Sequence, residues 1–332
     1  LLLLSALAAS LGAARIPLKD AYRLILDKIP LLSNFVTTEG IQANHQVIMY
    51  QIRLPRILLA MFVGIGLSAS GVMYQGLFRN PMADPYIIGI SSGATLGASI
   101  AMCLGVTSKI PGVSGIVIGA FAGALAVSFV VFNISRTKGG YLSVLTLLLS
   151  GIAIGSLCSA ATSFIMLTGG EDSHRIIFWI MGSISSAVWQ QVMVVVPVVT
   201  AGCIAFFFFT RSLNILAFGE QRAKQLGIPV NRVKTIVVVI ASVVVAAVVS
   251  VSGIIGFIGL IVPHMVRLVT GPDNRVLLPV SVFAGGVTLL LADTLARTVL
   301  VPRELPVGII TALLGTPFFI YLLRKSRVKG GL

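Results

Sequence analysis

The hydrophobic positions of this chain form long runs, and the polar positions gather in the gaps between them. A helix needs about 20 apolar residues to cross about 30 Å of hydrocarbon. Eight stretches are long enough: 57–77, 86–105, 112–132, 142–168, 192–210, 235–252, 276–300 and 306–323. The pattern therefore predicts an all-α, polytopic membrane protein with a single transmembrane domain over residues 1–332.

Two further segments bring the predicted number of transmembrane helices to about ten. Residues 1–14 are apolar but short, so they are either part of a first span or the core of a signal peptide, with Ala13 and Ala14 as the small residues of a cleavage site. We favour the span, because the rest of the chain is already multispan. Residues 253–267 contain glycines and a proline, which predicts a short or interrupted helix.

Composition and charge exclude a soluble protein. Hydrophobic residues make up 57% of the chain and charged residues only 10%, against about 25% charged residues in soluble domains. The net charge of +14 does not indicate a nucleic-acid partner, because the basic residues lie in short gaps between apolar runs. The gaps predicted to be cytoplasmic hold 14 basic residues and the short outer loops hold four, so the positive-inside rule predicts that both termini are cytoplasmic.

Two longer polar segments interrupt the spans. Residues 15–56 are predicted as an outer loop with an interfacial helix, because Leu18, Tyr22, Ile25 and Ile29 recur at helical spacing; a solvated loop helix would show the same spacing. Residues 211–234 are too polar to cross the membrane and too rich in Leu, Ile and Phe for a plain linker. They predict one or two short helices that either dock on a partner or rest on the inner membrane surface.

Residues that carry chemistry are sparse. The sequence has no HExxH motif, no acid pair at catalytic spacing and no G-x-x-x-x-G-K-S/T phosphate loop, and its three His and three Cys are scattered. We therefore expect no catalytic residue, no metal site and no cofactor on this chain, and ATP hydrolysis, if used, on another chain. The exception within a span is Asp293, which would cost about 2.5–3.5 kcal/mol at the bilayer centre. An ion pair with Arg297, four residues on, is predicted to offset this cost; a proton-coupled carrier is the alternative interpretation of Asp293.

Small residues predict close helix packing. Gly115, Gly119 and Gly123 form a double GxxxG, and Gly93 and Gly97 form another pair. Such positions let helix backbones approach in lipid. The hydroxyl-rich stretch from 150 to 163 either packs in the same way or lines a polar pathway.

Four segments together resemble the FecCD-type permease subunits of bacterial ABC importers for iron chelates, haem and cobalamin. They are 53–94, which contains RLPR and NPMADP, 213–227, with LNILAFGEQRAKQLG, 253–279, with GFIGLIVPHMVR, and 292–323, with ELPVGIITALLGTP. The resemblance implies a type II ABC importer permease that forms a homodimer in the bacterial cytoplasmic (inner) membrane. It also implies two P-loop ATPase subunits, which bind ATP and Mg, and an extracytoplasmic substrate-binding protein.

The resemblance further assigns expected roles to individual residues. We expect the cytoplasmic coupling helices of 211–230 to contact the ATPase through Leu213, Leu216, Gly219, Ala223 and Gly227. Docking of the binding protein falls on Arg53, Arg56 and Arg297. The inner gate and the translocation path fall on Asn80, Pro81, Met82, Ser150, Ser159 and Thr311.

The substrate is less constrained by the sequence. A ferric siderophore-type chelate is expected because it is the commonest substrate of the family, with haem or cobalamin as alternatives. An ion-coupled secondary carrier is the alternative of a different class, motivated by Asp293 and the interrupted segment 253–267.

Overall fold

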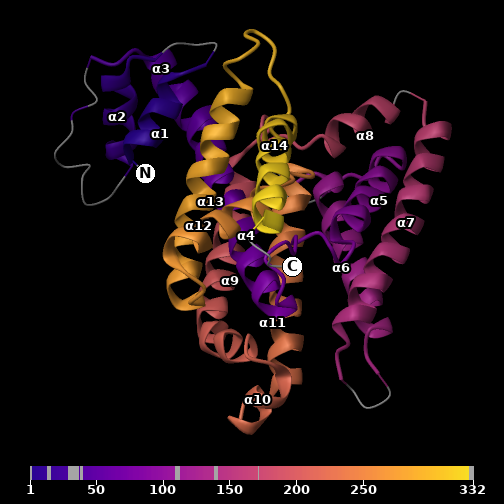
Figure 1. Ribbon diagram of the computed structural model, residues 1–332. Helices are drawn as coiled ribbons and strands as arrows, with labels where there is room; N and C mark the ends of the chain where they lie inside the picture. Colours follow the sequence, from indigo (N-terminus) through magenta and orange to yellow (C-terminus); the bar gives the residue numbers. More distant parts are fainter. Residues whose placement is uncertain are drawn as a thin grey trace.

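The protein is a bundle of long helices that lie side by side (Figure 1). The structure, a computed structural model, describes residues 2–12, 16–28, 37, 40–108, 113–137, 141–170 and 172–328. Within these ranges the β pairing consists of one isolated bridge between Arg136 and Leu142. The all-α class predicted from the sequence is confirmed.

The helices follow one another with short connections. They are α1 (Leu2–Ser10), α2 (Leu18–Asp27), α3 (Ala43–Val47), a π-helical turn (Ile48–Arg53), α4 (Leu54–Phe78), α5 (Ile90–Cys103), α6 (Gly115–Ile134), α7 (Val144–Thr168), α8 (Asp172–Ile180), α9 (Trp189–Leu216), α10 (Glu220–Gln225), α11 (Val230–Ser252), α12 (Ile258–Thr270), α13 (Asn274–Ala296) and α14 (Val307–Val328).

The predicted spans correspond to helices, but not all helices are as long as predicted. Six helical segments in the described ranges are long and apolar enough to cross a membrane: Ala43–Phe78, Gly115–Ile134, Val144–Thr168, Trp189–Leu216, Val230–Ser252 and Asn274–Ala296. Three apolar helices are shorter: Ile90–Cys103, Ile258–Thr270 and Val307–Tyr321. Together with α1 they agree with a chain of about ten membrane helices. The span predicted over 86–105 begins only at Ile90, because Gly89 adopts a left-handed conformation (φ 78°) that starts the helix there.

The segment 15–56, predicted as an outer loop with an interfacial helix, contains α2, α3 and the π-helical turn among its described residues. The helix predicted near its start is α2, but its buried face consists of Ala21, Leu24 and Ile25, and these residues pack against α1. Leu18 and Tyr22 are exposed instead, and residue 29 lies outside the described residues. From Ala43 onward the chain is helical and continues into α4, because residues 43–54 contain no glycine or proline to stop a helix.

Helix α4 is the centre of the bundle and packs against α9, α11, α12 and α13. Its glycines make these contacts close: a Cβ atom added to Gly64 would collide with the backbone of Gly285 on α13, and one added to Gly71 would collide with Gly259 on α12. The pair α5 and α6 is built in the same way, with Gly97 against Gly119. The close packing predicted from the GxxxG pattern is confirmed.

We expect Gly97→Ala to destabilise the protein by about 1–3 kcal/mol, because its new methyl group overlaps the α6 backbone. The midpoint of thermal unfolding, measured on purified protein in detergent, should fall. Gly256→Ala is the matched control, since Gly256 has no atom within 4 Å of an added Cβ. Equal midpoints for the two variants would contradict the assigned packing.

Candidate functional site

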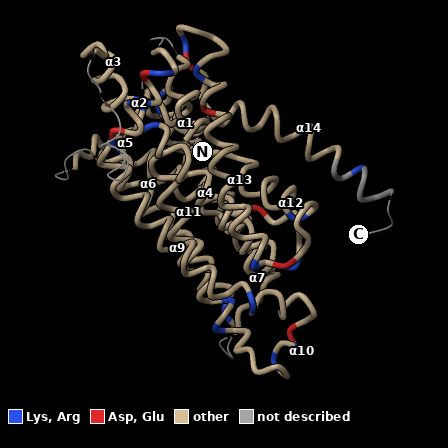
Figure 2. The backbone as a smooth tube through the Cα atoms, turned by 90° about the vertical axis from the view of Figure 1, so that its left-hand side faces the viewer, with Lys and Arg blue, Asp and Glu red and all other residues tan. Residues whose placement is uncertain are grey.

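The helices place two polar regions at opposite ends of the molecule. Figure 1 shows α10 at one end, and α1–α3, α8 and the connection between α13 and α14 at the other. In Figure 2 the central stretches of α6, α9 and α11 carry no charged residue and separate the two regions. An apolar middle with charged ends is the arrangement expected of a bundle that crosses a bilayer.

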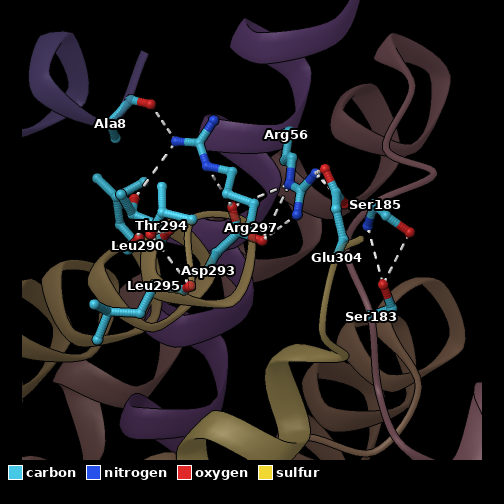
Figure 3. Close-up of polar contacts among 11 residues, drawn as sticks. Ala8, Arg56, Ser183, Ser185, Leu290, Asp293, Thr294, Leu295, Arg297 and Glu304 are labelled. Carbon is cyan, nitrogen blue, oxygen red and sulfur yellow. Dashed lines mark hydrogen bonds and ion pairs between the residues drawn. The ribbon is translucent and has the colours of Figure 1, made fainter. Parts of the chain in front are cut away.

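Arg56, in the first turn of α4, holds two carboxylates at once (Figure 3). Its Nε donates to both oxygens of Asp293 at 3.1 and 3.0 Å, and its Nη2 donates to Oδ1 at 2.9 Å. Its Nη1 donates to Oε1 and Oε2 of Glu304 at 3.1 and 2.8 Å. Only the planar fork of an arginine can grip two carboxylates in this way. Arg56 therefore ties together α4, α13 and the connection that leads to α14.

The other two arginines of this cluster lie beneath the N-terminal segment. Arg297, which follows α13, donates to the carbonyl oxygen of Ala8 in α1 (Figure 3), and Gly12 lies over the guanidinium of Arg53. The exposed fractions of Arg53, Arg56 and Arg297 are 5%, 7% and 6%. All three side chains are thus buried in this chain alone. Their role in docking the binding protein stays a prediction.

The predicted pair of Asp293 and Arg297 is present but secondary. Arg297 Nε lies 3.8 Å from Asp293 Oδ2, whereas Arg56 makes three hydrogen bonds to the same carboxylate. Asp293 is 1% exposed. A buried carboxylate is tolerated when it is paired and hydrogen-bonded, so the geometry supports a structural role for Asp293 rather than that of a carrier's proton site.

At the opposite end, most residues expected to couple to an ATPase face inward. Leu213 and Leu216 in the last turns of α9 and Ala223 in α10 are 0%, 1% and 0% exposed. Gly219 and Gly227 have φ of 112° and 78° and allow the chain to turn before and after α10. These five residues shape the segment 211–230, and the three apolar ones do not offer a surface to a partner.

The side chains that do offer such a surface are Phe218 and Leu226, which sequence analysis missed. They are 72% and 68% exposed, and both lie in the turns that flank α10. Each directly precedes one of the two glycines, so the turn glycines were the signal that pointed to them. Exposed apolar side chains next to polar ones mark interaction sites.

Asn214 fixes this segment to the start of α13. Its Oδ1 accepts a hydrogen bond from the backbone N–H of Asn274 at 2.9 Å, and its Nδ2 donates to Oδ1 of Asp273 at 2.6 Å. The backbone N–H of Arg275 and the amide of Asn214 lower the pKa of Asp273, which caps α13. Asn214 therefore joins the end of α9 directly to the start of α13.

Lys234 links α10 to α11. It is 4% exposed, and its Nζ donates to Oε1 of Glu220, the first residue of α10, at 2.5 Å. A buried ammonium group requires such a partner. Helix α10 is thus held by a charged contact as well as by its turns.

The predicted gate residues form a tight turn. Asn80 Oδ1 accepts a hydrogen bond from the backbone N–H of Met82 at 2.8 Å, and Asn80 and Pro81 are exposed. The loop that follows is anchored by Tyr86, whose hydroxyl donates to the carbonyl oxygen of Ile255 at 3.1 Å. The loop after the turn therefore touches the non-helical segment before α12. The action of Asn80, Pro81 and Met82 as a gate stays a prediction.

A groove of about 470 Å³ lies between this loop, α5 and α7. Its lining includes the hydroxyls of Ser92, Ser156 and Ser159, so one of the predicted path residues is found here. The other two are not: Ser150 is 8% exposed and donates to the carbonyl oxygen of Thr146 at 2.6 Å, and Thr311 is 4% exposed and donates to that of Gly308 at 3.1 Å. Among the described residues, no three His, Cys, Asp or Glu side chains lie close enough to hold a metal ion.

The protein family of the chain follows from its similarity to a known family model. The model of the FecCD transport family matches residues 1–325. The chain belongs to the FecCD transport family. It is therefore a multi-pass membrane permease of the ABC importer class, as the sequence motifs predicted.

Characterised relatives of this FecCD permease are similar over most of their length. The chain is 49% identical to the cobalamin import system permease protein BtuC of Halobacterium salinarum, over 87% of this chain and 77% of the relative. It is 42% identical to the hemin transport system permease protein HmuU of Yersinia pestis, over 84% of each chain. A solved structure described as an inward-facing conformation of an ABC transporter assigned to the metal-chelate type superposes with a TM-score of 0.83 at 30% identity, over 98% of this chain and 96% of that one.

We expect Asp293→Ala to destabilise this FecCD permease by about 3–5 kcal/mol, because it removes one partner of a buried ion pair. Asp172→Ala removes the partner of Arg175 in an exposed pair and should cost at most about 1 kcal/mol. Thermal unfolding of the two purified variants in detergent measures the difference. Similar losses in both would argue against the central role of the contact between Arg56 and Asp293.

Proposed function

We propose that this chain is the transmembrane subunit of an ATP-driven, binding-protein-dependent importer of a large metal chelate. The observation that carries the proposal is the two-ended layout of a FecCD permease: an exposed apolar surface at α10, a carboxylate-binding arginine cluster at the opposite end, and a hydroxyl-lined groove on the helices between them. Each region matches one step of import.

The end that carries α10 is proposed to bind the ATPase. The chain has no phosphate loop, so the energy source must be a separate subunit that binds ATP and Mg. Phe218 and Leu226 form the exposed contact, and Asn214 and Lys234 connect it to α13 and α11. Movement of the ATPase is thereby transmitted mechanically, and this chain is not itself the enzyme.

A second copy of the chain is proposed to complete the path. Helix α14 extends away from the rest of the bundle (Figure 2), and Leu313 and Leu314 on it are 65% and 61% exposed. The groove beside α7 is likewise open on one side, with Ile152 62% exposed in its lining. A homodimer would cover these apolar surfaces and enclose the groove, with lipid around the outside.

We propose the bacterial cytoplasmic membrane as the location, with α10 inside and the arginine cluster outside. The greater number of basic residues in the loops on the α10 side supports this orientation. The arginine cluster then faces an extracytoplasmic binding protein, and the end of α14 lies in the cytoplasm.

We propose cobalamin, or a similar corrinoid, as the substrate. The similarity to a cobalamin permease at 49% identity and the hydroxyl-lined groove without a histidine both support a corrinoid over haem. A ferric siderophore, the substrate expected from the sequence, and haem are the alternatives that an uptake assay separates.

Proteoliposomes with the permease, its ATPase and its binding protein should accumulate cobalamin only when ATP is present. Haem and a ferric siderophore, tested in parallel, should enter at least about tenfold more slowly, as expected when the path and the binding protein select together. Faster uptake of either would reassign the substrate. Accumulation by the permease alone, driven by an ion gradient, would refute the ATP-driven importer.

Phe218→Asp and Leu226→Asp should each reduce ATP-driven uptake at least about tenfold, because a charge in an apolar contact weakens binding of the ATPase. Gln225→Asp is the matched control: it introduces the same charge at an exposed polar position of the same segment and should have little effect. Co-purification of the ATPase with each variant measures the binding directly. Wild-type uptake by both apolar variants would remove Phe218 and Leu226 from the coupling surface.

A further inference from the structure

The two carboxylates that bind Arg56 differ in their exposure to solvent. Asp293 is 1% exposed and stands on the last turn of a packed helix, so it is fixed. The side chain of Glu304 is 44% exposed and lies in the connection between α13 and α14. Figure 3 shows both carboxylates on Arg56. The contact with Asp293 is buried, and the Glu304 side of the second contact is exposed to solvent.

The backbone around Glu304 allows its side chain to leave without unfolding the connection. The next residue, Leu305, donates its backbone N–H to the carbonyl oxygen of Ala296 at 3.0 Å, and Gly308 donates to that of Gly182 at 3.3 Å. These bonds hold the chain on both α13 and the connection between α8 and α9. Rotation of the Glu304 side chain alone would free the Nη1 edge of Arg56 and leave the three hydrogen bonds to Asp293 in place.

The charge of the cluster favours a further anion. Arg53, Arg56 and Arg297 contribute three positive charges, and Asp293 and Glu304 contribute two negative charges. When Glu304 turns away, the excess of positive charge rises while the guanidinium groups stay mostly buried. Arg56 stays paired with Asp293, and its Nη1 edge, which donates to Glu304, becomes available for a second carboxylate. An acidic side chain of a docking protein has the chemistry to supply it.

We propose that Glu304 competes with the binding protein for Arg56. In the chain alone, Glu304 occupies the edge of the Arg56 guanidinium that a carboxylate of the binding protein takes on docking. The inference rests on the proposed function, since it assumes that the binding protein docks at this end. Docking then exchanges one carboxylate for another on the same guanidinium. The exchange also explains how arginines that are buried in the chain alone can serve as docking residues, and it keeps docking weak enough for release after delivery.

The test is the affinity of the permease, complexed with its ATPase in detergent, for its purified binding protein. Glu304→Gln keeps the shape of the side chain and removes its charge, so we expect about two- to fivefold tighter binding. Asp172→Asn is the matched control, because it removes the carboxylate from an exposed arginine pair at the same end of the molecule. It should leave the affinity unchanged.

Three results would overturn the proposal: unchanged binding by Glu304→Gln, weaker binding, or an equal gain in Asp172→Asn, which would indicate a general effect of charge. Glu304→Ala must show the same gain as Glu304→Gln, which guards against a new contact made by the amide. If the wild-type complex binds its binding protein and only the gain is missing, the competitor role fails alone. If the wild type binds none, the proposed function fails with it.

Discussion

The close packing of α4 on α13 is the constraint on which the rest of the structure depends. Gly64 and Gly285 let the two backbones meet, and Arg56 binds Asp293 where the pair ends at the arginine cluster. At the other end, Asn214 binds the start of α13. The proposed partner sites are thus connected by one tightly packed pair of helices, because a close-packed interface transmits a displacement rather than absorbing it.

Much of the architecture could be predicted because it follows from local patterns. Long apolar runs predicted the helices, and small residues such as Gly97 predicted that helices pack closely. The burial of Leu216 and Ala223 could not be predicted, because an amphipathic segment outside the bilayer does not reveal which face meets its own protein. Phe218 and Leu226 had one signal in the sequence, the glycine that follows each of them, but a glycine alone does not reveal which side chains the turn leaves exposed.

The contacts of Arg56 in the arginine cluster could not be predicted, because they join residues that are far apart in the sequence. Arg56 and Asp293 are 237 residues apart in sequence, and Asp293 had a suitable partner much nearer, in Arg297. Local spacing therefore predicted the weaker of its two contacts. The role of Glu304 could not be predicted from the sequence, because it lies in a connection without helical periodicity. Only its contact with the Arg56 guanidinium in the structure indicates that role.

The uninterrupted helical stretch Ala43–Phe78 has a consequence for how the molecule sits in its membrane. Its 36 residues extend for about 54 Å at 1.5 Å per residue, and the hydrocarbon layer is only about 30 Å thick. Even with a moderate tilt, several turns must stand clear of the lipid. The excess length places the turns before α4, which include Arg53, outside the hydrocarbon layer, at the end of the molecule where the binding protein is proposed to dock.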